Sequence, residues 1–320
     1  MLHSTLRCFA DNTRICSDSH NITELQSDLD EVTKWSSRNN MVLHEDKFEY
    51  IWYLVNKRNP LYELPFVHEQ FQYTTSTGTI PTPVDQLRDL GITVSSDSSW
   101  TSHIRSSCDK ARKMAAWVFS VFHSRNTGVM LTLYKSLVRS HLEYCSPLWN
   151  PAKVYDIQEL ESVQRTFTSK IHGLQHLHYW DRLKTLSLMS LQRRRERYIV
   201  MHMWKILHGL TSNDLEVQFT VNPRLGTLAK VPAVRTKSSA AHQTLYETSF
   251  SVMGPRLWNC IPWHIRAVSK HDGFKHHMTA FMLSLPDKPP IRGFTSPNSN
   301  SILDWCNDRD ASALWGGQQL

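Results

Sequence analysis

Glycine is scarce in this sequence, with only 11 among 320 residues. Loops that cradle phosphates rely on glycine, and neither the dinucleotide fingerprint G-x-G-x-x-G nor the P-loop pattern occurs. Zinc patterns are absent as well, because none of the 17 histidines falls in H-E-x-x-H or in a Cys/His zinc spacing. The sequence therefore argues against dinucleotide-binding enzymes, P-loop NTPases and dedicated zinc sites.

Paired cysteines and long apolar runs are also missing. The six cysteines form no C-x-x-C pair, which predicts free thiols in a reducing compartment. The longest mainly apolar stretch, residues 114–122, is far shorter than the roughly 20 residues that span a bilayer. Arg7 and Asp11 interrupt the N-terminus, which therefore lacks the pattern of a signal peptide. We expect a soluble protein of the nucleus or cytoplasm without a membrane partner.

Basic residues are concentrated in the middle of the chain. Residues 101–210 carry 17 Lys and Arg against 7 Asp and Glu, whereas residues 1–100 carry 8 against 14. Such a basic block suits a polyanion, because each cation set against a phosphate releases condensed counterions. A solvated helical surface explains the same charges equally well.

Residues 1–100 predict a mixed α/β segment. Two strand-like runs, 6–10 and 13–16, flank the polar pair Asp11-Asn12 and indicate a hairpin. An amphipathic helix follows and ends at Asn39-Asn40, with five apolar residues on one stripe: Ile22, Leu25, Leu29, Val32 and Trp35. Further strand candidates lie at 48–55, 71–73 and 90–94.

From about Ser102 to Phe122 the apolar spacing becomes helical. Three more helices are predicted, over residues 129–142, 156–171 and 183–210. The last has its apolar stripe at Leu188, Ile199, Met203, Ile206 and Leu210. We expect Arg193, Arg194 and Arg197 to project from the opposite side, with Arg195 near the stripe edge.

The fold class expected is therefore α+β, in four parts. Residues 1–100 form the mixed part, 101–210 a basic helical part, 211–285 an irregular C-terminal region and 286–320 a flexible tail rich in Pro, Ser and Asn.

The segment Phe9-Ala10-Asp11-Asn12 resembles the Phe-Ala-Asp-Asp hairpin in the palm of non-LTR retrotransposon reverse transcriptases. Similar motifs follow in order at residues 35–40, 41–47, 48–55, 87–92, 134–144, 147–151, 160–165, 190–197 and 257–259. Over nearly its whole length the chain is similar to the end of the palm, the thumb and the C-terminal region of jockey-like or CR1-like elements. The resemblance implies a palm at 1–100 and a thumb at 101–210.

The resemblance also implies a site. Nucleotidyl transfer by two metals needs carboxylates that hold two Mg²⁺ about 4 Å apart. In the family, two of these carboxylates come from the hairpin, so Asp11 is the implied Mg²⁺ ligand, and the neutral amide of Asn12 replaces the second. Lys47 matches the lysine of the next palm motif, a candidate general acid for the pyrophosphate leaving group. From the residues alone, Asp11-Asn12 is a turn pair and Lys47 a solvated side chain, and only the resemblance favours the catalytic roles.

An RNA/DNA template–primer is the partner that the resemblance implies. Its implied contacts are basic residues of two helices: Arg105, Lys110, Arg112, Lys113, Arg193, Arg194 and Arg197. The run Arg193, Arg194, Arg195 and Arg197 also matches a nuclear import signal. Ordinary solvated helix faces are the alternative for all seven contacts. Three tryptophans are candidates for base stacking or for the core: Trp149, Trp258 and Trp305.

Only ten residues precede Asp11, too few for the fingers and for the palm strand that carries the other catalytic Asp. We therefore expect a truncated reverse transcriptase without polymerase activity of its own. The alternatives are a non-catalytic helical module that binds nucleic acid and a pseudogene product without function.

Overall fold

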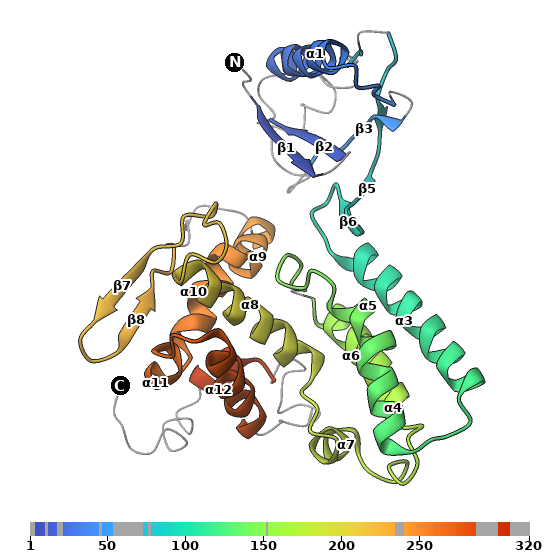
Figure 1. The fold of residues 1–320 in the computed structure, drawn as a ribbon, viewed down its shortest axis with the longest axis vertical. Helices are drawn as coiled ribbons and strands as arrows, with labels where there is room; N and C mark the ends of the chain where they lie inside the picture. The colour runs from blue at the N-terminus through green and yellow to red at the C-terminus, as the bar shows by residue number, and fades with distance from the viewer. Residues whose placement is uncertain are drawn as a thin grey trace. The chain divides into compact units, whose positions relative to one another are not determined.

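The computed structural model divides the chain into two compact units, unit 1 (Met1–Ser99) and unit 2 (Trp100–Leu320). Helices and two-stranded sheets make up the regular structure, which confirms the α+β expectation at this coarse level (Figure 1). The structure describes residues 4–9, 12–17, 22–44, 47–53, 73–75, 78–151, 153–233, 240–285 and 300–307.

The N-terminal hairpin forms as predicted. Strands β1 (Thr5–Phe9) and β2 (Asn12–Cys16) pair in antiparallel fashion, with Phe9 opposite Asn12. Asn12 is therefore the first residue of a strand, whereas the sequence interpretation placed it in the polar pair between the strands. Asp11 lies outside the described residues.

Helix α1 (Ile22–Arg38) confirms the helix expected after the hairpin, and Leu25, Leu29 and Val32 of the predicted stripe are half-buried. Its most deeply buried side chains are polar: Asp28, Thr33 and Ser36. Trp35, which the predicted stripe would bury, is 55% exposed. The reason is a small core, since Tyr73 and Ile92 are the only large apolar side chains buried in the described part of unit 1.

The remaining strands of unit 1 are short: β3 (Glu49–Tyr50), β4 (Thr82–Pro83), β5 (Gln86–Asp89) and β6 (Ile92–Ser95). Strands β5 and β6 form a tight hairpin through Leu90 and Gly91, whose φ angles are 45° and 85°. Two successive left-handed residues match the twist of a two-residue hairpin. Leu90 and Gly91 thus form the turn, so the strand predicted over 90–94 begins two residues later. Within the prediction for 48–55, Leu54 and Val55 lie outside the described residues, as do Phe71 and Gln72 of 71–73.

In unit 2, helix α3 (Thr101–Val121) confirms the helix predicted from Ser102 to Phe122. Its buried residues include Ile104, Cys108 and Val118 of the predicted stripe. With this face α3 packs against the helical segments that follow it.

The helix predicted over 129–142 forms with a π-helical turn at its centre. Its three pieces are α4 (Thr127–Leu133), η3 (Tyr134–Val138) and α5 (Arg139–Glu143). The wider turn of η3 leaves both Tyr134 and Val138 completely buried.

Helix α6 (Val154–Thr168) confirms the prediction for 156–171, but the single helix over 183–210 is wrong. The structure has α7 (Tyr179–Thr185) and α8 (Leu191–Leu207), separated by a turn. In this turn Ser190 caps α8, because its Oγ accepts a hydrogen bond from the Arg193 N–H at 3.3 Å. Serine is among the preferred N-cap residues, so this start is encoded locally.

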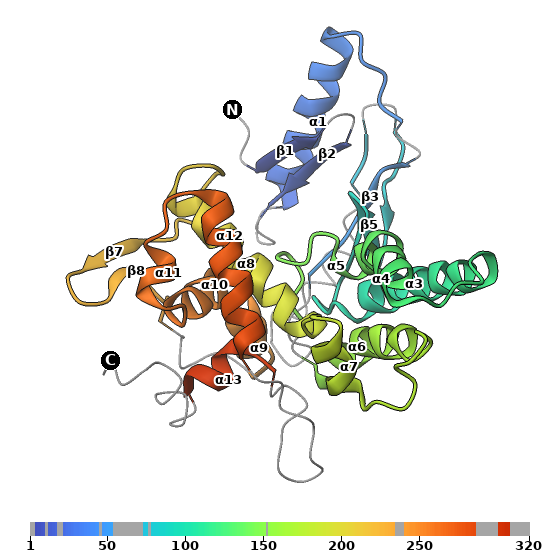
Figure 2. The same cartoon turned by 60° about the horizontal axis from the view of Figure 1, so that its bottom comes forward.

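Helix α8 runs through the middle of unit 2, between α5, α6 and α7 on one side and α10 (Phe250–Asn259) and α12 (His271–Ser284) on the other (Figures 1 and 2). It packs against α6, α10 and α12. Both of its faces are therefore covered.

The irregular C-terminal region expected at 211–285 is wrong. It contains α10 and α12, the hairpin β7 (Phe219–Asn222) and β8 (Gly226–Ala229), and helices α9 (Ala240–Thr248) and α11 (Trp263–Arg266). Apart from α9, these elements share one apolar core with α8, which includes Met203, Trp204, Trp258, Phe274 and Met278. Helices α9, α10 and α11 have ten residues or fewer and α10 contains Pro255, so the sequence of this region carries little helical periodicity.

The flexible tail predicted from residue 286 is wrong for its described part. Helix α13 (Ile302–Asn307) follows Ser301, and Ile302 is completely buried in the same core. The other residues of 286–320 lie outside the described residues.

Asn259 connects α10 to the β7–β8 hairpin, since its Oδ1 accepts from the Ala229 N–H at 2.9 Å and its Nδ2 donates to the Ala229 oxygen at 2.8 Å. Asn259→Ala is expected to lower the free energy of unfolding by about 1–3 kcal/mol, because both backbone groups lose their partner. Urea unfolding followed by circular dichroism measures this change. Val221→Ala, at a side chain that is 82% exposed, is the control and should change stability by less than about 0.5 kcal/mol. Equal effects of the two variants would contradict this role.

Candidate nucleic-acid interface

Three cations lie on the outer face of α3. The helix buries Ile104, Cys108 and Ala111, so the side chains of Arg105, Lys110 and Lys113 are exposed to solvent. Within the described ranges these three side chains make no hydrogen bond or ion pair. They are therefore open to a solvent-borne partner.

Arg112 behaves differently from its neighbours. Its Nη2 atom lies 2.7 Å from Glu159 Oε1 and 3.1 Å from Ser162 Oγ, both on α6. Its Nη1 atom lies 3.5 Å from Asp109 Oδ1 on its own helix. The side chain therefore links α3 to α6, and of the four predicted contacts on α3 it is the one engaged within the protein.

The arginines of α8 do not project from an open face as expected. Arg193 is only 2% exposed, and its Nη1 donates to the backbone oxygens of Leu285 at 2.8 Å and Met282 at 3.4 Å. Carbonyl groups at the end of a helix lack intrahelical donors. The Arg193 guanidinium supplies such a donor at the end of α12. Arg195 and Arg197 are also buried. The predicted projection of Arg193, Arg194 and Arg197 into solvent is wrong, because α6 packs on one face of α8 and α10 and α12 pack on the other.

Arg194 and Arg197 belong to a group of four cations that we call the α5–α8 cation cluster: Lys135, Arg139, Arg194 and Arg197. Its one carboxylate is Glu143, which accepts from Arg194 Nε and, at 2.9 Å, from Arg194 Nη2. The Arg139 Nε atom lies 3.4 Å from the same carboxylate. Positive charge thus exceeds negative charge in this cluster.

Mutual repulsion is visible in the pKa values of the cluster. Burial, followed by the charge of Arg194, lowers the pKa of both Arg139 and Arg197. Burial also lowers the pKa of Lys135, and the charges of Arg139 and Arg194 lower it further. Arg194 is the exception, because its burial is outweighed by the hydrogen bonds and the charge of Glu143, which together raise its pKa. A bound anion would relieve this excess charge.

The sequence interpretation missed Lys135 and Arg139. Their spacing to Glu143 is four residues at each step, which places them along one face of a helix. That signal was present, but Glu143 becomes the partner of Arg194 only through tertiary packing.

The hairpin of unit 1 does not assemble a metal site from its described residues. A cavity of about 30 Å³ lies beside Asn12 and is lined also by Arg7, Arg14 and Asp89. Asp89 is already paired with Arg14 at 2.6 Å. No group of three His, Cys, Asp or Glu able to hold a metal occurs among the described residues. The implied Mg²⁺ ligand, Asp11, lies outside those residues, so the Mg²⁺ site stays a prediction.

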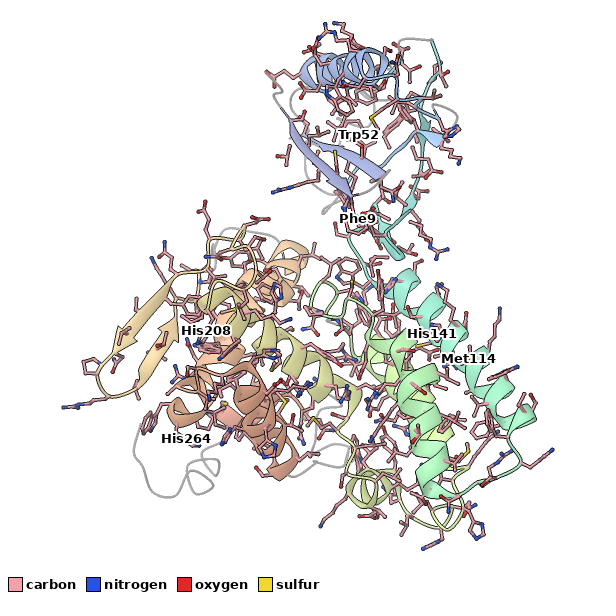
Figure 3. All side chains as sticks on the ribbon, in the orientation of Figure 1. Phe9, Trp52, Met114, His141, His208 and His264 are labelled. Atoms are coloured by element: carbon pink, nitrogen blue, oxygen red, sulfur yellow. The ribbon has the colours of Figure 1, made fainter. Side chains whose placement is uncertain are left out.

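Phe9 and Lys47 are the other described parts of the implied catalytic motif. Phe9, labelled in Figure 3 at the end of β1, is 66% exposed. Lys47 is exposed, its backbone N–H donates to the His44 oxygen at 3.0 Å, and no interaction in the described ranges joins its side chain to the hairpin. Within the described part of unit 1, Lys47 and Asn12 are therefore not linked by a side-chain interaction.

Two of the three candidate tryptophans belong to the protein interior. Trp149 and Trp258 are completely buried, and their indole N–H groups donate to the Tyr144 oxygen at 2.8 Å and the Thr227 oxygen at 3.1 Å. Both are therefore core residues and are not available for base stacking. The side chain of Trp305 lies outside the described residues.

The chain matches no protein-family model, no curated protein and no solved structure. None of the described helices has the length and apolar composition to cross a membrane. The resemblance to reverse transcriptases thus depends on the sequence motifs alone.

Proposed function

We propose that this chain carries the end of the palm, the thumb and the C-terminal region of a non-LTR retrotransposon reverse transcriptase, and that unit 2 binds a template–primer of RNA and DNA. The exposed, unpaired side chains of Arg105, Lys110 and Lys113 on α3 are the observation that supports this function best. The ordered motifs of the sequence supply the identity of the polymer, since cations alone select no particular polyanion.

The α5–α8 cation cluster supports the same function from a second helix pair. Partly buried cations that share one carboxylate have lost some hydration, so a phosphate would restore favourable interactions at little further cost. We therefore assign α3 to contacts with the nucleic-acid backbone and the cluster to a further phosphate. Both contacts are independent of base sequence.

Salt dependence tests this function. A labelled RNA–DNA hybrid titrated with the full chain is expected to bind with an affinity that falls steeply as salt rises, because counterions are released. The double variant Lys110→Ala/Lys113→Ala should reduce the slope of log K against log salt by about 2, one for each lost phosphate contact. Fluorescence anisotropy at several salt concentrations measures the slope.

The control is Lys275→Ala, an exposed lysine on α12, which should leave the slope unchanged. Absence of binding by a folded sample would contradict the function, as would an unchanged slope in the double variant. Primer extension with Mg²⁺ is expected to be absent, because Asn12 offers a neutral amide where a second carboxylate is needed. Extension that is lost on Asp11→Ala would show a working catalytic site.

A further inference from the structure

Arg195 is an unusual residue of the α8 interior. It is 1% exposed, and its Nε, Nη1 and Nη2 atoms all lack a hydrogen-bond partner. A guanidinium has five N–H donors, and buried polar groups in folded proteins are almost always hydrogen-bonded. Among the described residues no side chain or backbone group accepts from this guanidinium, so its hydrogen-bond acceptor has to come from elsewhere.

The carboxylates near Arg195 are occupied elsewhere. Glu161 accepts from the Leu191 N–H at 2.9 Å, and Glu196 accepts from Ser301 Oγ at 2.6 Å. Glu143 is bound to Arg194. These three carboxylates balance the charge of Arg195 from a distance, and they oppose the lowering of its pKa by burial. They supply charge compensation but no acceptor, so what Arg195 lacks is a hydrogen-bond acceptor.

Arg195 lines a cavity of about 310 Å³, which is large enough for a small molecule. Its wall combines residues from α8 and α9, from the segment before α6 and from the start of α13, including Asn150, Gln192, Arg195, Glu247, Ser301 and Asp304. These elements are far apart in the sequence. The cavity is therefore a product of the tertiary structure of unit 2, and its wall includes the residue whose guanidinium is unsatisfied.

We propose that this cavity binds a small carboxylate, held by the guanidinium of Arg195. The planar fork of arginine matches the two oxygens of a carboxylate and forms two parallel hydrogen bonds. A monoanion is preferred over a phosphate dianion, because Glu196, Glu247 and Asp304 place further carboxylates in the same wall. This site is separate from the basic residues assigned to nucleic acid and does not depend on that function.

The test uses the full chain, with acetate, L-lactate and L-serine as probes and with chloride and inorganic phosphate as comparison ions. At least one of the three carboxylates is expected to raise the unfolding temperature in a saturable manner and to give a dissociation constant by calorimetry. Arg195→Met should weaken that binding at least tenfold. Lys205→Met, at an exposed position of the same helix, should leave it unchanged.

A second variant covers the case in which Arg195→Met does not fold. Thr248 lies on α9 in the wall of the cavity, so the longer side chain of Thr248→Met should fill part of the cavity while Arg195 is retained. The described hydrogen bonds of the Thr248 hydroxyl go to carbonyls of its own helix, so their loss should cost little stability. Thr248→Met should also abolish carboxylate binding. The inference is overturned if no carboxylate binds, if chloride or phosphate binds as tightly as the carboxylates, or if binding persists in Thr248→Met.

Discussion

Glu161→Ala is expected to lower the free energy of unfolding of unit 2 by about 3–5 kcal/mol, the usual cost of leaving a buried charge without its compensating partner. Glu161 is buried where α6 meets α7 and the start of α8. Its carboxylate accepts from the hydroxyl of Tyr179 and, at 2.9 Å, from the N–H of Leu191. The variant leaves the Tyr179 hydroxyl and the Leu191 N–H without this acceptor. It also removes the carboxylate whose charge acts most strongly on Arg195.

The carboxylate is the end of a buried hydrogen-bond network, which increases the cost. Gln164 Nε2 donates to the Tyr179 hydroxyl at 2.9 Å, and Gln164 Oε1 accepts from the Tyr134 hydroxyl at 2.7 Å. Polar groups in the interior are costly when they are only partly satisfied. Removal of Glu161 therefore destabilises the contact of α6 with α7 and α8 together.

Urea unfolding followed by circular dichroism measures this change. Glu159→Ala is the matched control, because Glu159 lies two residues away on α6 and its pair with Arg112 has side chains that are 37% and 43% exposed. An exposed pair contributes about 0–1 kcal/mol, so the control should be nearly neutral. A loss of less than about 1 kcal/mol for Glu161→Ala would contradict the role of the network.

Raising the pH from 4.5 to 7 is expected to cost the wild type about 3 kcal/mol of stability relative to the variant Glu196→Gln. Burial raises the pKa of Glu196 from the ordinary value of 4.5 to about 7. Between these values the folded chain holds a proton that the unfolded chain has released. Stability therefore falls as the pH rises through this window and becomes constant above it.

Glu196→Gln is a suitable reference because its amide can fulfil the same contacts. Glu196 accepts from Ser301 Oγ at 2.6 Å and from the Ile302 N–H at 2.7 Å, and so holds the start of α13. A glutamine oxygen can accept from Ile302 while its amide N–H donates to Ser301. The variant keeps α13 in place and removes the titration.

The measurement is a series of urea unfolding curves from pH 4 to 8 for the wild type and for Glu196→Gln. The difference between the two free energies of unfolding at each pH cancels the titration of the histidines and of the other groups that both proteins share. Glu216→Gln, at an exposed position, should follow the wild type at every pH. Parallel curves for the wild type and Glu196→Gln would show that Glu196 does not titrate in this window.

The local elements of this protein are readable in its sequence. The hairpin at Thr5–Cys16 and helices α1, α3 and α6 form where strand alternation or helical spacing predicts them. Each depends on interactions between residues close in the chain, which a pattern records directly. The exposed cations of α3 follow from the same pattern, since its apolar stripe is indeed the buried face.

The interior of unit 2 required the tertiary structure. A helical period shows one apolar face, but α8 is covered on both, so Arg193 donates to carbonyl oxygens at the end of α12 and Arg195 lines a cavity. Nothing local distinguishes these arginines from solvated ones, because Arg193 binds carbonyls at the end of α12 and the cavity beside Arg195 is walled by α9 and α13, all far along the chain. The sequence by itself thus determined which segments are helices and strands, whereas the packing of distant segments decided which charges are buried and which remain free to meet a ligand.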